Sequence, residues 1–348
     1  MISAFRWYGP EDRVPLAWLR QMTPRPLVVT HLPDVLPGDE WTVERLKVLK
    51  NQLDAHELSL GPIESVFWTD AMKTARPGRD EHIENFIKTL HNLRMVFPDQ
   101  DPLVVTYNIM ALDWSRTHLA WEHPNGARGL AFDNAAWENL DLSNGLFLPG
   151  WGKPISKAEF DALQESYATL GTDGAWDAVG YVLKALVPEA EKLNIRLAAH
   201  PNDPPWSTLG LPALLTDAAA IRRLLALAPS PSNGLCFCTG SYGALPENDV
   251  NAMLHEFKES VVWCHLRVTK TTNTKQFHEA DHAVTDGDID LFEVLRTLKD
   301  IGFTGIFRSD HGLDLLHETE LEMRGYPAID RYVANKMIWA YSKGLREG

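Results

Sequence analysis

The stretch IFRSDHG, residues 306–312, begins with two apolar residues and continues with an arginine, a carboxylate and an imidazole before a glycine ends it. An apolar start is typical of a buried strand, but Arg308, Asp310 and His311 are costly to bury unless each has a partner. Parallel strands of a barrel carry functional side chains at their carboxyl ends, which share one face. The stretch therefore predicts a strand that ends in a functional site.

Seven earlier segments resemble this strand, and each is followed by a helical pattern or by an insertion and then a helix. Strict alternation of strands and helices favours a parallel sheet with crossover helices. Eight repeats favour an α/β fold closed into a (β/α)8 TIM barrel, and no Gly-x-Gly-x-x-Gly follows the first strand to indicate a dinucleotide fold. The eight expected strands are 4–9, 26–32, 58–65, 102–110, 195–201, 234–240, 261–267 and 304–311.

The connection after the fourth strand is much longer than the others. Residues 111–178 are rich in tryptophan, and SKAE at 156–159 is typical of a capping box at the start of a helix. A long loop at the carboxyl end of a barrel strand is in position to cover an active site. We therefore expect a single barrel domain over residues 1–348, with 111–178 as a long helical insertion that forms a cap.

Composition excludes several classes of function. The 348 residues have 45% hydrophobic content and a net charge of −14, so we expect no nucleic-acid partner. There is no apolar signal core near residue 1 and no 18-residue apolar run, so we expect no membrane partner. Three cysteines in apolar segments suit a reducing compartment. The sequence thus predicts a cytoplasmic protein with a small-molecule substrate.

Four consecutive strands end in side chains that bind transition metals. The fifth strand ends at His200, the sixth at Cys238, the seventh at His265 and the eighth at Asp310. Two imidazoles, a thiolate and a carboxylate at one end of a barrel are a credible ligand set for a divalent transition metal. Each residue alone also has a structural explanation, but four at corresponding strand positions favour a metal site.

Two other cysteines and one arginine need separate explanations. Cys236 competes with Cys238, because residues two apart in a strand point to the same side. Cys238 is nearer the carboxyl end, so we expect Cys236 one layer deeper as filler, and Cys264 pointing toward the helices. By the same spacing Arg308 lies one layer below Asp310. A buried arginine needs an acidic partner, and the candidates are Asp310 itself and Glu64 at the end of the third strand.

Several motifs extend over the chain: FRWYGPEDRVPL, YNIMALDWSRT, LPGW, AAHPNDPP, CTGSYG, HLR, FHEADH, SDHG and GYPAIDR. In their order they resemble the mannonate dehydratase family over essentially the whole chain. The resemblance implies a xylose-isomerase-like barrel, Mn²⁺ or Fe²⁺ as cofactor, and a homo-oligomer. It implies a carbon–oxygen lyase (hydro-lyase) that dehydrates D-mannonate to 2-keto-3-deoxy-D-gluconate. The metal ligands it implies are His200, Cys238, His265 and Asp310, and it places His311 and Tyr326 beside the substrate.

Elimination of water next to a carboxylate needs a group that removes the α-proton and one that protonates the departing hydroxyl. His311 adjoins Asp310 but points elsewhere, which suits a general acid, and Tyr326 is a candidate base. The residue types do not decide which of the two removes the α-proton. The candidates for contact with substrate are Arg6, Tyr8, Asn108, Arg267, Glu279 and His282. For Glu279 and His282 the alternative is a supporting role behind the residues that touch substrate, and for the other four it is a salt bridge or hydrogen bond at the barrel rim.

The chain departs from the family pattern at three places. YNIMALDW is one residue shorter and lacks a proline, Thr69 in TDAMK stands where the family has histidine, and Ser309 stands where it has proline. The four expected ligands survive, so the changes bear on which sugar acid is accepted. One alternative is a dehydratase that acts on a different sugar acid, or an isomerase of the same barrel superfamily; the thiolate argues against the isomerase. The other is a non-catalytic metal-binding barrel, against which His311 and Tyr326 argue.

Overall fold

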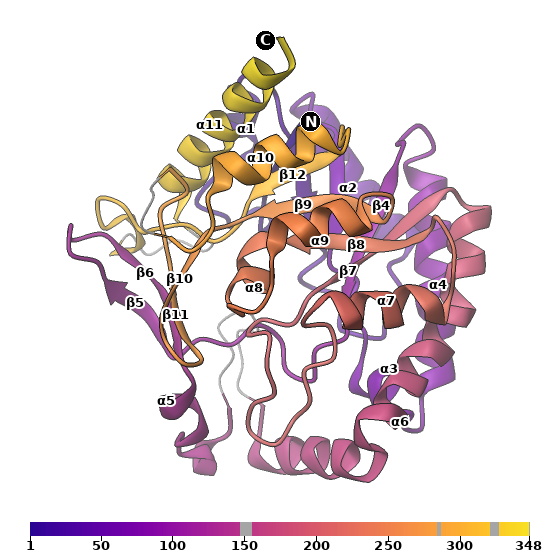
Figure 1. The fold of residues 1–348 in the computed structure, drawn as a ribbon. Coiled ribbons are helices and arrows are strands. Elements are labelled where there is room, and N and C mark those ends of the chain that lie inside the picture. The colour runs from indigo at the N-terminus through magenta and orange to yellow at the C-terminus, as the bar shows by residue number, and fades with distance from the viewer. Residues whose placement is uncertain (147–154, 284–286, 321–326, 348) are drawn as a thin grey trace.

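The computed structural model describes residues 1–146, 155–283, 287–320 and 327–347. Eight parallel strands close into a barrel in the order β1-β12-β9-β8-β7-β4-β3-β2 (Figure 1). All eight expected strands are present, and the predicted (β/α)8 class is confirmed. The strands are β1 Ile2–Arg6, β2 Leu27–Thr30, β3 Leu60–Glu64, β4 Leu103–Asn108, β7 Ile195–His200, β8 Asn233–Cys238, β9 Val261–Leu266 and β12 Ile306–Ser309.

Helices connect the barrel strands and cover them from outside (Figure 1). Several begin at an aspartate whose carboxylate accepts backbone N–H groups of the first turn: Asp217, Asp249 and Asp290. The longer helices bury apolar residues toward the core, as α10 (Leu291–Asp300) does with Leu291, Val294, Leu295 and Leu298. The helices are α1 Leu16–Leu19, α2 Val43–Ala55, α3 Asp70–Thr74, α4 Arg79–Val96, α5 Asn134–Glu138, α6 Lys157–Lys192, α7 Ala218–Leu227, α8 Thr239–Gly243, α9 Val250–Phe257, α10 Leu291–Asp300 and α11 Ala328–Glu347, with 3-10 turns at Leu142–Asn144 and Glu318–Glu320.

Alternation along the strands separates two apolar clusters. The larger one packs the outer faces of the strands against the helices and includes Cys264, as predicted. The smaller one belongs to the barrel interior and contains Cys236, together with Ala4, Val29 and Ala198. Cys236 is therefore filler below the strand ends, and the carboxyl ends above it are left for polar side chains.

The insertion after β4 contains strands that the sequence did not predict. β5 (His118–Glu122) and β6 (Arg128–Asp133) pair antiparallel, and β6 also pairs with β11 (Gln276–Glu279) of the β10–β11 hairpin, in which β10 is Thr269–Asn273. This four-stranded sheet lies to one side of the barrel, at the left of Figure 1. Two loops far apart in sequence thus form one structure, which periodicity within either loop cannot show.

The helical part of the insertion begins where it was expected. Ser156 and Glu159 form the predicted capping box at the start of α6. The helical geometry is interrupted at Gly171, whose φ of +63° lies in the left-handed region that glycine adopts without strain. The expected end of the cap at residue 178 falls inside α6, so insertion and barrel share this helix. Part of the segment, 147–154 with the LPGW motif, lies outside the described residues.

Candidate active site and metal centre

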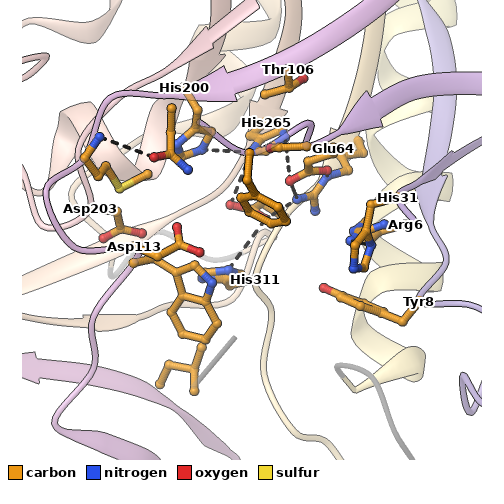
Figure 2. A pocket seen from close by; sticks show the side chains of 18 of the residues that line it. Arg6, Tyr8, His31, Glu64, Thr106, Asp113, His200, Asp203, His265 and His311 are labelled. Carbon is orange, nitrogen blue, oxygen red and sulfur yellow. Dashed lines mark hydrogen bonds and ion pairs between the residues drawn. The ribbon is translucent and has the colours of Figure 1, made fainter. Parts of the chain in front are cut away.

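A cavity of about 420 Å³ opens at the carboxyl ends of the barrel strands. Its lining comes from residues at or just after strand ends and from the insertion, including Trp114, Leu119 and Leu130. Figure 2 shows Arg6, Tyr8 and His31 grouped on one side of this cavity, and His200 and Asp203 on the other. The cavity is thus bounded by cationic, acidic and aromatic groups, which suits a polar small molecule.

The four residues expected to bind metal lie together at the floor of this cavity. One potential ligand atom from each of His200, Cys238, His265 and Asp310 lies within 4.8 Å of all the others. His200 Nε2 is 3.2 Å from His265 Nδ1, which is 3.6 Å from Asp310 Oδ2, and Cys238 Sγ is 3.8 Å from the same oxygen. Strand register accounts for this, because Cys238 pairs with His265 and His265 pairs with Arg308 next to the end of β12.

One ring nitrogen of each imidazole, Nε2 of His200 and Nδ1 of His265, lies among the four candidate ligands. His200 Nδ1 is 2.8 Å from the carbonyl oxygen of Pro201, so its proton is held there and Nε2 is an acceptor. His265 Nδ1 lies 3.2 Å from His200 Nε2, and the other ring nitrogen of His265, Nε2, is 3.5 Å from Glu64 Oε1 and makes no hydrogen bond to the described residues. Two imidazole nitrogens, a carboxylate oxygen and a sulfur whose ligand atoms lie within 4.8 Å of one another form the kind of donor set that holds a metal ion. The residues therefore fit a divalent transition metal.

Arg308 lies beneath the cluster with two acidic partners, both among those predicted. Its guanidinium donates to both carboxylate oxygens of Glu64 at 2.7 and 3.0 Å, and Nη2 is 2.7 Å from Asp310 Oδ1. Burial alone would raise the pKa of Asp310, but Arg308, His311 and His265 outweigh burial and hold that pKa well below its ordinary value. The pKa of Glu64 falls to about 2 in the same way: burial would raise it, and Arg308 with His265 lowers it. Both carboxylates are ionised at neutral pH.

His311 follows β12 directly and lines the cavity. Its Nδ1 nitrogen contacts two buried side chains. Nδ1 is 3.2 Å from Glu279 Oε1 and 3.3 Å from Arg116 Nη2. The two hydrogens of Arg116 Nη2 already have better acceptors, Asp203 Oδ2 at 2.9 Å and Glu279 Oε1 at 3.0 Å. Nδ1 therefore donates its proton to Glu279, and Nε2 is the ring nitrogen on the side of Asp310, whose Oδ1 is 3.8 Å away.

Behind His311, two guanidinium groups and two carboxylates form a fully buried cluster. Arg116 and Arg267 both donate to Asp203 and to Glu279, at distances of 2.7 to 3.0 Å. Burial favours the neutral carboxyl of Glu279, but Arg267 and the hydrogen bond to His311 lower its pKa to about 2. With both acids ionised, the four charges compensate one another away from water.

The residues expected to contact substrate divide into two groups. Arg6, Tyr8 and Asn108 line the cavity. Contact of Arg267, Glu279 and His282 with substrate stays a prediction; the three residues are buried and are not among the described lining residues. Pairing compensates their burial: Arg267 and Glu279 neutralise each other, and His282 Nδ1 is 3.2 Å from Asp330 Oδ2. Tyr326 lies outside the described residues.

Sequence reasoning missed other residues of the site. His31, Asp113, Trp114 and Asp203 line the cavity, and Arg116 supports it. A signal existed for four of them, because DWSRT lies shortly after the end of β4 and HPNDPP begins at the last residue of β7, where barrel sites are built. No strand-end rule identifies which of their charged residues face the cavity.

Fold and site together define a (β/α)8 barrel enzyme with a candidate metal centre at the strand ends. The family model for D-mannonate dehydratase (UxuA) matches residues 1–347. A mannonate dehydratase of Streptococcus agalactiae is 38% identical over 351 residues, covering 100% of this chain and 98% of that protein. The crystal structure of mannonate dehydratase from Streptococcus suis serotype 2 superposes with a TM-score of 0.89 at 30% identity, covering 100% of this chain and 95% of that one.

A more distant likeness concerns the fold alone. A xylose isomerase-like TIM barrel protein from Mycobacterium smegmatis superposes with a TM-score of 0.53 at 12% identity, covering 96% of this chain and 91% of that one.

The chain belongs to the mannonate dehydratase family, and the resemblance deduced from the motifs is confirmed. It is therefore a hydro-lyase of metal-dependent type. Among its described residues no helix is long and apolar enough to cross a membrane.

Proposed function

We propose that this chain removes water from D-mannonate to give 2-keto-3-deoxy-D-gluconate. The observation that supports this best is the convergence of His200, Cys238, His265 and Asp310 on one cavity, with the Nε2 side of His311 facing the same space. Such a site combines the two requirements of the reaction, stabilisation of charge next to a carboxylate and proton transfer. The choice of D-mannonate as the substrate rests on membership of the mannonate dehydratase family.

In this proposal the four clustered residues hold a divalent metal. When bound, the ion supplies Lewis-acid stabilisation of the negative charge that develops as the α-proton leaves. The thiolate disfavours Mg²⁺ and Ca²⁺, and we propose Mn²⁺ or Fe²⁺ as the ion. Metal analysis of protein purified without chelator tests this, with about one Mn²⁺ or Fe²⁺ per chain expected and only Mg²⁺ or no metal as the contrary result.

Proton transfer is assigned to Nε2 of His311. Its ring is fixed by the hydrogen bond from Nδ1 to Glu279, so Nε2 can protonate the departing β-hydroxyl without reorienting. Tyr326 is proposed as its partner from the family motif. Nε2 lies 3.8 Å from Asp310 Oδ1, and both residues line the same cavity, so the proposed proton donor and the proposed metal ligand are next to each other.

The opposite side of the cavity is proposed to bind the remaining substrate oxygens. Arg6 Nη2 is 2.6 Å from His31 Nδ1, and the Arg6 guanidinium lies 4.4 Å from the centre of the Tyr8 ring. Burial raises the pKa of Tyr8 to about 12, beyond the opposing effect of Arg6, so Tyr8 is a neutral hydroxyl at physiological pH. A guanidinium, a phenol and the Asn108 amide match hydroxyl and carboxylate oxygens of a sugar acid.

A panel of hexonates tests the substrate. Metal-loaded protein is incubated with D-mannonate and its epimers, and formation of 2-keto-3-deoxy acid is measured. We expect D-mannonate to give the highest kcat/KM. Turnover of another hexonate alone would contradict the proposed substrate, and isomerisation without loss of water would contradict the reaction.

We also propose a cytoplasmic homo-oligomer. The three cysteines are free and buried, which suits a reducing compartment. Family precedent supports the oligomer. Light scattering on the purified protein tests it, and a mass of one chain, 39.1 kDa, would contradict it.

A further inference from the structure

The turn after β8 is built around Arg267. Thr239 Oγ1 accepts from the Arg267 backbone N–H at 2.9 Å and donates to its carbonyl oxygen at 2.6 Å. A Cβ at Gly240 would lie 2.5 to 2.6 Å from carbons of the Arg267 side chain, so only glycine admits this close approach. Ser241 Oγ is 3.3 Å from Arg267 Nη1. Three consecutive residues directly after Cys238 thus contact one buried arginine.

The direction of the hydrogen bonds in this contact follows from chemistry. Arginine has donors and no acceptor, so Arg267 Nη1 donates to the Ser241 oxygen. The hydroxyl hydrogen of Ser241 must point elsewhere, and Cys238 Sγ lies 3.1 Å from Oγ. The backbone N–H of Ser241 reaches the same sulfur at 3.4 Å. The sulfur thus accepts two hydrogen bonds, one of them oriented by a guanidinium.

Two carboxylates hold the Arg267 guanidinium in place, and Ser241 supplies the hydroxyl that it contacts. Its Nε and Nη2 donate to Glu279, and Nη1 donates to Asp203 at 2.7 Å as well as to Ser241. Arg267 and Ser241 are both fully buried, so water does not compete for these bonds. The network that positions His311 through Glu279 therefore also reaches the sulfur side of the metal centre.

We propose that Arg267 and Ser241 form a relay that limits electron donation from Cys238 to the metal. This rests on the proposed metal site. Hydrogen bonds to a thiolate withdraw electron density from sulfur, which weakens its preference for softer ions. Ser241 and Arg267 are positioning residues that act through Cys238. The relay favours a harder ion such as Mn²⁺ over Zn²⁺ in a site that contains a thiolate.

Cobalt substitution tests the relay without measuring activity. Co²⁺ bound to a thiolate gives a sulfur-to-metal charge-transfer band in the near ultraviolet. Loss of a hydrogen bond makes sulfur easier to oxidise, so Ser241→Ala should move this band to longer wavelength. Ser342→Ala is the matched control, because Ser342 is also buried but its hydroxyl bonds to the Trp339 carbonyl on α11. The control should leave the band unchanged.

Cys238→Ser separates failure of the relay from failure of the metal site. The band should disappear in Cys238→Ser and persist in Cys236→Ser; a band that survives loss of Cys238 would overturn the site itself. If Cys238 gives the band and Ser241→Ala leaves it in place, the relay is overturned and the site stands. In chelator competition, Ser241→Ala should also shift the ratio of Zn²⁺ to Mn²⁺ affinity toward Zn²⁺, by roughly tenfold. An unchanged ratio would likewise overturn the relay.

Discussion

Arg308 Nη2 lies 2.7 Å from Oδ1 of Asp310, two residues later in the chain. An alternating strand directs both side chains into the barrel, and the carboxyl end of β12 sets the carboxylate at the level of the proposed metal. Glu64, at the end of β3, accepts hydrogen bonds from Nε and Nη2 of the same guanidinium. The arginine thus fixes the orientation of one proposed ligand and neutralises charge below it.

Arg308→Met should weaken metal binding by roughly 10- to 100-fold, because Asp310 loses the group that orients it. Glu64 would also be left without this guanidinium, so some loss of thermal stability is expected. Arg308→Lys keeps a positive charge but not the planar guanidinium, so its metal affinity should lie between those of the parent protein and Arg308→Met. Metal retained after dialysis against graded chelator measures the effect. Equal retention in all three proteins would show that Arg308 does not support the site.

The cysteines should differ sharply in metal retention. Cys238→Ser should lose most bound metal, since Sγ is the proposed ligand, whereas Cys236→Ser changes filler in the barrel interior and Cys264→Ser a contact with the helices. Metal content after purification without chelator is the measurement. A larger loss in Cys236→Ser than in Cys238→Ser would reverse the assignment.

Strand positions predicted much of this site from sequence. A period of two in each strand and a shared carboxyl face bring His200, Cys238, His265 and Asp310 together, because parallel register is nearly fixed in a closed barrel. The same rule separated Cys236 from Cys238 and found the acidic partners of Arg308.

Contacts between loops could not be predicted in this way. The pairing of β6 with β11 joins segments more than a hundred residues apart, and no local pattern encodes it. The partners of Arg267 and Glu279 could not be predicted for a related reason. Polar residues near strand ends were expected to face substrate, but these two face each other and Arg116 inside the molecule.

His311→Asn should retain metal and lose turnover, by ~10²–10⁴-fold for a missing acid–base group. Metal content and kcat are measured on the same preparation, with His91→Asn as the control at a surface-exposed histidine. Tyr326→Phe is expected to behave like His311→Asn. Loss of metal from either variant would make that residue a ligand and remove its proposed role in proton transfer.

Glu279 should contribute to acid sensitivity. Its folded pKa of about 2 is below the ordinary value of 4.5 for a glutamate, so its stabilising contribution is complete above the unfolded pKa and is lost as pH falls toward the folded pKa. Glu279→Gln should therefore lower stability at neutral pH and reduce the further loss between about pH 5 and pH 2. Urea midpoints across this range measure both effects. A variant with the parent's full acid-dependent loss would show that other carboxylates account for it.

Gly312 lies shortly after β12, the last barrel strand, and is the final residue of the IFRSDHG stretch. The carboxylate of Asp330 leaves no room for a side chain at this position. A Cβ at this position would lie 1.8 Å from Asp330 Oδ2. Asp330 is buried, accepts from the Leu313 N–H at 3.2 Å and pairs with His282 at 3.2 Å. Gly312→Ala must therefore displace either the turn that carries His311 or the carboxylate that secures it. We expect a cost of about 1–3 kcal/mol from overpacking and a fall in kcat from misplacement of His311.

A double-mutant cycle with Asp330→Ala tests the cause of that effect. If the clash is responsible, Gly312→Ala should cost little once Asp330 is truncated, so the double variant should resemble Asp330→Ala alone in both melting temperature and kcat. Residues in direct contact are expected to be non-additive in this way. Effects that simply add would mean that glycine is required at position 312 for a reason other than the Asp330 carboxylate.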